Sequence, residues 1–111
     1  MANVLDFTKR KKEYLTVKLD DPKKTVLMIG TPTKRILEDF MYLNAKIEED
    51  GGASGELVDD LYEICAKIMS FNKGGLKITS DYLSEFFDIE DIMIFFNAYM
   101  DYMNTLTNSK N

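Results

Sequence analysis

The hydrophobic pattern of the chain changes its period at Gly30-Thr31-Pro32, and this change constrains the fold more than any other feature. Before it, apolar and polar residues alternate, as in a strand with one covered face. After it, apolar residues recur every three to four positions, as on one side of a helix. The 111 residues suffice for one hydrophobic core. We therefore predict a mainly α fold, a compact four-helix domain preceded by an N-terminal β-hairpin, within one globular unit at residues 13–106.

The predicted hairpin covers residues 13–29. Its two β-type runs are separated by Asp20-Asp21-Pro22-Lys23, where the proline suits the second position of a tight turn. The first run has two faces, one formed by Leu15, Val17 and Leu19 and the other by Tyr14, Thr16 and Lys18. An isolated hairpin is marginal in water, so this one must lie on the helices or pair with a neighbour's strand. An exposed edge would be a ready place for subunit addition.

The helical half predicts helices at about 32–49, 55–71, 80–87 and 89–106. Their start signals are Thr31 with Pro32, then Ser54, then Thr79 or Ser80, and finally Asp88. The run Asn72-Lys73-Gly74-Gly75 indicates a helix stop, because it lacks the glycine spacing and the Lys-Ser/Thr of a phosphate loop. Residues 1–12 are expected to form a flexible basic arm, and residues 107–111 a frayed tail.

Charge is distributed unevenly along the chain. Residues 1–35 hold nine Lys/Arg and four Asp/Glu, a balance of +5, whereas residues 36–111 hold five and fifteen, a balance of −10. An acidic helical body repels phosphate, which argues against a nucleic-acid surface. The basic run Lys9-Arg10-Lys11-Lys12 is short and has no interleaved aromatic residues. We expect it to be a solvated arm or to meet an acidic partner.

The residue types favour no enzyme. The chain has no histidine, which removes the commonest general base and metal ligand, and its one cysteine, Cys65, lies on the apolar side of a predicted helix. Its acidic pairs fall at helix ends or solvent faces, and Asp20-Asp21-Pro22 lacks the spacing of a calcium loop. No apolar run is long enough for a membrane span, and the N-terminus lacks a secretory signal. We therefore expect a cytoplasmic protein without catalytic, cofactor or metal sites.

The last predicted helix carries more apolar surface than one core stripe requires. A stripe at helical spacing, formed by Ile89, Ile92, Met93, Phe96, Tyr99, Met100, Met103 and Leu106, is widened by Ile94, Phe95, Ala98 and Tyr102. Such a helix is either deeply buried or meets another molecule. Periodicity leaves both interpretations open. If it meets a partner, the candidate binding residues are Met93, Phe95, Phe96, Tyr99, Met100, Tyr102 and Met103.

Four stretches in order resemble the tail assembly chaperones of long-tailed phages and prophages of Gram-positive bacteria. They are Leu5-Asp6-Phe7, Tyr14-Leu15-Thr16-Val17-Lys18-Leu19-Asp20, Gly30-Thr31-Pro32-Thr33-Lys34, and Ser70-Phe71-Asn72-Lys73-Gly74 leading into Ile78-Thr79-Ser80-Asp81-Tyr82-Leu83. Together they comprise 26 of the 111 residues and are spread between positions 5 and 83, and none is a catalytic signature.

The resemblance implies a mostly helical viral protein that forms spiral or ring-like homo-oligomers and coats the tape measure protein until tail tube subunits displace it. It also implies a place in the cytoplasm of the infected bacterium, absence from the mature virion, and a frameshifted longer form. Subunit contacts would come from the basic arm or from the hairpin, at Tyr14, Thr16, Lys18, Val26 and Met28.

Two other functions are compatible with this sequence. The first is a structural head–tail connector or tail completion protein, which would also be small, acidic and without catalytic residues. The second is a regulator of the host that uses the basic arm on nucleic acid. The acidic body disfavours this second function.

Overall fold

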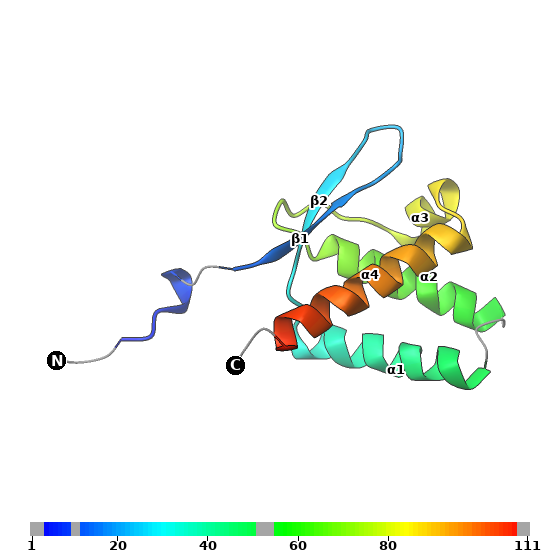
Figure 1. The fold of residues 1–111 in the computed structure, drawn as a ribbon. Coiled ribbons are helices and arrows are strands. Elements are labelled where there is room, and N and C mark those ends of the chain that lie inside the picture. The colour runs from blue at the N-terminus through cyan, green and yellow to red at the C-terminus, as the bar shows by residue number, and fades with distance from the viewer. Residues whose placement is uncertain (1–3, 10–11, 51–54, 109–111) are drawn as a thin grey trace.

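The chain runs from an N-terminal arm through a β-hairpin into helices (Figure 1). The computed structural model describes residues 4–9, 12–50 and 55–108. In these residues a 3-10 turn, Phe7–Lys9, is followed by strands β1 (Tyr14–Lys18) and β2 (Val26–Gly30) and by helices α1 (Lys34–Asp50), α2 (Gly55–Ser70), α3 (Ser80–Phe86) and α4 (Ile89–Asn108). The predicted mainly α fold with an N-terminal hairpin is confirmed.

Strands β1 and β2 pair antiparallel, with Leu15 opposite Ile29 and Val17 opposite Leu27. These four residues point toward the helices, where Leu27 and Ile29 belong to the core and Leu15 and Val17 pack against it. The residues between them face outward, as the alternation predicts. The hairpin therefore lies on the helices.

The hairpin turn is anchored by Asp21. Lys24 N donates to the Asp21 carbonyl at 3.0 Å, which places Pro22 at the second position of the turn, as predicted. The buried Asp21 carboxylate accepts from Thr25 N at 2.8 Å, from the Thr25 hydroxyl at 2.7 Å and from the Tyr82 hydroxyl at 2.5 Å. Burial alone would raise the pKa of Asp21, but these hydrogen bonds lower it from 3.8 to about 2. The turn is thereby fixed to α3.

Helix α1 begins two residues later than expected. The Thr33 hydroxyl, not that of Thr31, accepts from Ile36 N, at 3.4 Å. Gly30 N still bonds to the Phe71 carbonyl at 3.1 Å, so the chain leaves the sheet extended before Pro32. The caps at Thr79 and Asp88 are confirmed. The Thr79 hydroxyl accepts from Tyr82 N, and Asp88 exchanges reciprocal hydrogen bonds with Asp91. The expected start at Ser54 lies outside the described residues.

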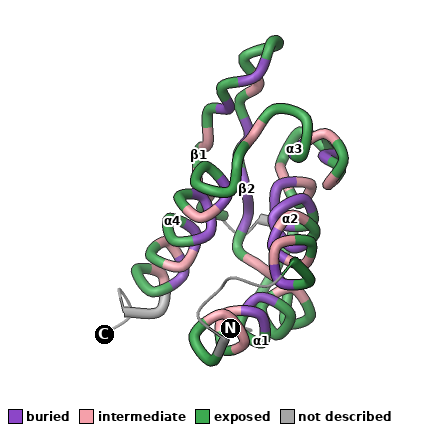
Figure 2. Tube along the Cα trace, turned by 90° about the vertical axis from the view of Figure 1, so that its right-hand side faces the viewer, coloured by how far each residue is buried: buried purple, intermediate pink, exposed green. Residues whose placement is uncertain are grey.

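Helix α2 is the centre of the fold, since it packs against α1, α3, α4 and β2. Figure 2 shows the buried positions gathered on the inner sides of α2 and α4. An aromatic cluster joins α1 to α4, with the ring centroids of Phe40 and Phe96 4.3 Å apart and those of Phe40 and Tyr99 5.7 Å apart. Cys65 lies fully inside this core, and its predicted burial is confirmed.

The predicted helix stop at Asn72 is confirmed and also protects the sheet. The Asn72 side chain bonds to the Met69 and Leu76 carbonyls at 2.8 and 2.6 Å, which turns the chain after α2. The segment 71–73 then runs beside β2, where Lys73 N donates to the Met28 carbonyl at 2.9 Å. The outer edge of β2 is therefore covered by backbone.

Candidate protein-binding surface

Of the two interpretations left open for the aromatic and methionine stripe of α4, the structure favours the buried helix. Four of the seven candidate residues lie in the core and three pack against it half-buried; the core residues are Phe95, Phe96, Tyr99 and Met103, and the half-buried ones are Met93, Met100 and Tyr102. Helix α4 packs on α2, meets α1 through Phe40, and is joined to the hairpin by a hydrogen bond from Tyr99 to Gly30. The buried-helix interpretation holds for most of the stripe.

The apolar surface that α4 does expose centres on Ile94. The side chain of Ile94 is 65% exposed, although it lies in the middle of the helix. It shares its face with Glu90, Asn97 and Asp101, all exposed polar residues. Single exposed aliphatic residues are common on protein surfaces, and Ile94 stands out because it also borders an apolar groove.

A groove of about 400 Å³ runs between β1 and α4 beside Ile94. It is mainly apolar, and its lining is formed by Leu15, Thr16, Val17, Lys18, Leu19, Asp20, Met69, Phe87, Asp91, Ile92, Ile94, Phe95 and Ala98. Six consecutive residues of the first hairpin arm, 15–20, take part, and none comes from β2. Because neighbouring strand residues point to opposite faces, the groove must follow the edge of β1 and not one face of the hairpin.

The outer edge of β1 has unused backbone groups. In an antiparallel pair, only alternate residues bond across to the partner strand. Leu19 N donates to the Thr25 carbonyl at 2.8 Å, so the odd-numbered residues of β1 bond inward to β2, and Thr16 and Lys18 turn their backbone groups outward. Among the described residues, none donates to or accepts from this edge. An extended segment could pair there as a third strand.

The outward face of the hairpin carries the five residues predicted for self-assembly. Thr16, Lys18, Val26 and Met28 are exposed, and Val26 keeps 56% of its surface accessible. Tyr14 is half-buried, with Lys73 Nζ 5.6 Å from the centroid of its ring. The structure thus brings these residues together on one exposed face, and their role in self-assembly stays a prediction.

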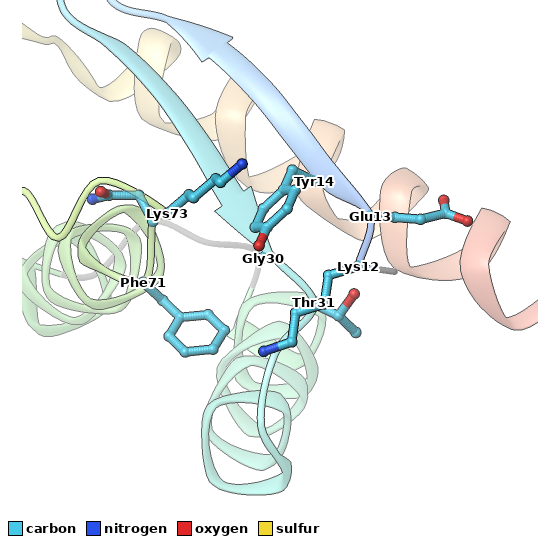
Figure 3. Close-up of a pocket in the computed structure, with 8 residues that line it drawn as sticks. Lys12, Glu13, Tyr14, Gly30, Thr31, Phe71 and Lys73 are labelled. Carbon is cyan, nitrogen blue, oxygen red and sulfur yellow. The ribbon is translucent and has the colours of Figure 1, made fainter. Parts of the chain in front are cut away.

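A smaller hollow lies at the base of the hairpin (Figure 3). It measures about 220 Å³, with Tyr14 and Phe71 on its walls and Lys12 and Lys73 among its lining residues. A Cβ added at Gly30 would lie 3.2 Å from the Phe71 ring, so a larger residue at this position would require that ring to shift. A third hollow, of about 280 Å³ between α1 and α2, is lined by acidic side chains and the Lys67–Asp39 ion pair. Neither has the apolar lining of the groove beside β1.

The N-terminal arm carries large apolar side chains in solvent. Val4 is 84% exposed, Leu5 80% and Phe7 69%. Figure 1 shows the arm extending away from the body. The radius of gyration, 15.7 Å, exceeds the value of about 13 Å expected for a compact domain of this length. The arm therefore does not contribute to the core of its own chain.

Comparison with protein-family models, curated proteins and solved structures finds no significant match for this chain. In the described part of the chain, none of the helices has the length and apolarity needed to cross a membrane. The acidic residues of the described segments form no group of three or more suited to hold a metal ion. The groove between β1 and α4, which is apolar and borders the open edge of β1, is thus the candidate binding surface.

Proposed function

We propose that this chain is a protein-binding assembly factor that holds an apolar segment of another protein in the groove between β1 and α4. Its role would be that of a phage tail assembly chaperone, with the tape measure protein as its client. The observation that carries the proposal is the exposure of Ile94 beside an apolar groove and an unpaired strand edge.

The groove provides two kinds of attraction at once. Its apolar lining favours burial of aliphatic or aromatic side chains, at about 25 cal/mol per Å² of apolar surface removed from water. The backbone groups of Thr16 and Lys18 add hydrogen bonds that do not depend on the client's sequence. This combination suits a protein that must cover many similar apolar stretches, as a chaperone of a long tape measure protein would.

The charge of the body supports the same proposal. Residues 36–111 carry a balance of −10, so copies bound side by side on a client repel one another outside their contacts. Such repulsion keeps a coated client soluble. The four sequence stretches that resemble tail assembly chaperones agree with this role, and they include β1 and the helix stop at Asn72.

The test is co-elution of the purified chain with fragments of the tape measure protein from the same phage or prophage. The variant Ile94→Lys places a charge in the groove and should weaken binding by about tenfold or more. Its matched control is Val26→Lys, the same kind of change at a similarly exposed residue on the outward face of the hairpin. Equal loss in both variants, or no co-elution of the unaltered chain, would contradict the proposal.

A structural tail component would also bind other phage proteins, so location provides the second test. A chaperone leaves before the particle is finished. Mass spectrometry should therefore detect the chain in lysates of infected cells and not in purified tails. Stoichiometric retention in tails would instead favour a head–tail connector or tail completion protein.

A further inference from the structure

We infer that the groove has a second ligand, the N-terminal arm of another copy of this chain. Residues 4–9 of one copy would lie along the open edge of β1 in the next, parallel to that strand, with Leu5 and Phe7 against α4. This inference rests on the proposed function only in that both use the same groove. It does not require a client.

The arm has the composition that the groove requires. Its three large apolar side chains, Val4, Leu5 and Phe7, are the most exposed of their kind in the described residues. Phe7–Lys9 form a 3-10 turn in the free chain, and pairing with β1 would extend this turn. An extended segment places alternate side chains on opposite faces. Leu5 and Phe7 would therefore enter the groove together, toward Ile94, while Val4 and Asp6 would point outward.

Backbone pairing also matches. The open edge of β1 offers the outward groups of Thr16 and Lys18, which an added strand would use. Asp6 would lie on the same outward face as Lys18, an opposite-charge pair across neighbouring strands. In the free arm, Asp6 instead bonds to Thr8, from whose N–H its carboxylate accepts at 3.0 Å. This local bond is exposed and can be exchanged at little cost.

Charge decides the direction of the added strand. The acidic residues that line the groove, Asp20 and Asp91, lie where β1 ends and α4 begins. The opposite end, at Tyr14, is adjacent to Lys12 and Lys73. The basic run 9–12 follows Phe7 in the sequence, so only a parallel arm would bring it to the acidic end.

A parallel arrangement requires a second copy. Parallel strands need a crossover of about a dozen residues or more, whereas only residues 10–13 separate Lys9 from β1. An arm that folded back on its own strand would pair antiparallel and place its basic run at the basic end of the groove. The arm of one copy and the groove of another are different surfaces, so the contact can repeat from copy to copy.

Sedimentation equilibrium of the purified chain, without client, tests the inference. Phe7→Asp in the arm and Ile94→Lys in the groove should each weaken self-association by about tenfold or more. Val4→Asp controls for charge in the arm on its outward side, and Met41→Lys controls for charge at an exposed apolar residue of α1, away from the groove and the hairpin. Both controls should retain self-association.

Mixing the two defective variants gives the decisive result. Phe7→Asp keeps an intact groove and Ile94→Lys keeps an intact arm, so together they should form one-to-one dimers and no larger species. A monomeric unaltered chain at every accessible concentration would overturn the inference. Self-association that survives Phe7→Asp would also overturn it, as would self-association that is lost in Met41→Lys and retained in Ile94→Lys.

Failure of this inference can be separated from failure of the proposed function. Client binding is measured on Phe7→Asp, whose groove is free of the arm. If that variant binds tape measure fragments while the unaltered chain shows no self-association, only the arm contact is wrong. If self-association follows the expected pattern and no fragment binds, the client assignment alone is wrong.

Discussion

The hydroxyl of Tyr99 donates a hydrogen bond to the carbonyl oxygen of Gly30 at 3.1 Å, across 69 positions of the sequence. This bond joins the middle of α4 to the last residue of β2. Both residues are buried, and burial raises the pKa of Tyr99 well above its usual range. Three residues further along α4, the Tyr102 hydroxyl is also buried but has no hydrogen-bond partner among the described residues. The two tyrosines therefore form a matched pair for experiment.

Tyr99→Phe should destabilise the fold by about 1 kcal/mol, because it removes a buried hydrogen bond and keeps the ring in place. Tyr102→Phe should leave the free energy of unfolding unchanged or raise it by up to about 1 kcal/mol, since it removes a hydroxyl that is buried without compensation. Urea unfolding followed by circular dichroism measures both. Equal losses in the two variants would contradict the assignment of these hydroxyls.

Acid should destabilise the chain through Asp21. Because its pKa in the folded chain is about 2, below its ordinary value of 3.8, the unfolded chain takes up the proton first as the pH falls. The stabilisation is therefore complete above pH 3.8 and is lost as the pH falls through about 2. Unfolding free energies measured between pH 5 and the acid limit of stability, about 2, should show this decline.

Asp21→Asn removes the charge and should flatten that decline, together with a loss of stability at neutral pH. Asp20→Asn is the control. Its exposed side chain forms an ion pair with Lys24, and the variant retains Asp21 with its hydrogen bonds from Thr25 and Tyr82. It should therefore keep the decline, and an identical pH profile for the two variants would count against the role of Asp21.

The thiol of Cys65 should be unreactive in the folded chain. Burial raises its pKa from 9.0 to about 12, so very little thiolate is present near neutral pH, and the side chain has no contact with solvent. Labelling with an aromatic disulfide reagent at pH 8 should proceed only as fast as the chain opens, and should accelerate in urea. Rapid labelling without denaturant would show that the Cys65 thiol on α2 is accessible to the reagent in the folded chain.

The two sides of α4 should respond differently to truncation. Phe96→Ala removes a core ring stacked on Phe40 and should cost about 3–5 kcal/mol of stability. Ile94→Ala should change stability by less than about 0.5 kcal/mol, because most of that side chain is in solvent. Thermal unfolding measures both. A large loss of stability from Ile94→Ala would mean that the Ile94 side chain is buried in solution.

Local signals predicted most of the fold. The alternation of β1, the turn at Pro22 and the caps at Thr79 and Asp88 depend on neighbouring residues only, and all are confirmed. The start of α1 was placed two residues early, because Thr31 and Thr33 are equally good caps by type. What decided between them was the bond from Gly30 N to the Phe71 carbonyl, a contact between distant segments.

The site was predicted less well, since periodicity does not reveal how many neighbours a helix has. The stripe of α4 is wide because α2, α1 and the hairpin all contact this helix, and so Phe96 and Tyr99 belong to the core. One signal could have identified the exposed side. Ile94 is spaced with Glu90, Asn97 and Asp101, which makes it an apolar residue on the polar face of its helix.

The two edges of the hairpin differ, and this difference determines how many extended segments can pair with one molecule. The segment 71–73 occupies the edge of β2, whereas the described residues leave the edge of β1 open. The sheet can therefore grow by one strand in one direction. If the proposed contacts form, each molecule can bind only one extended segment at a time, and a client segment and the arm of a neighbour would then compete for the same edge.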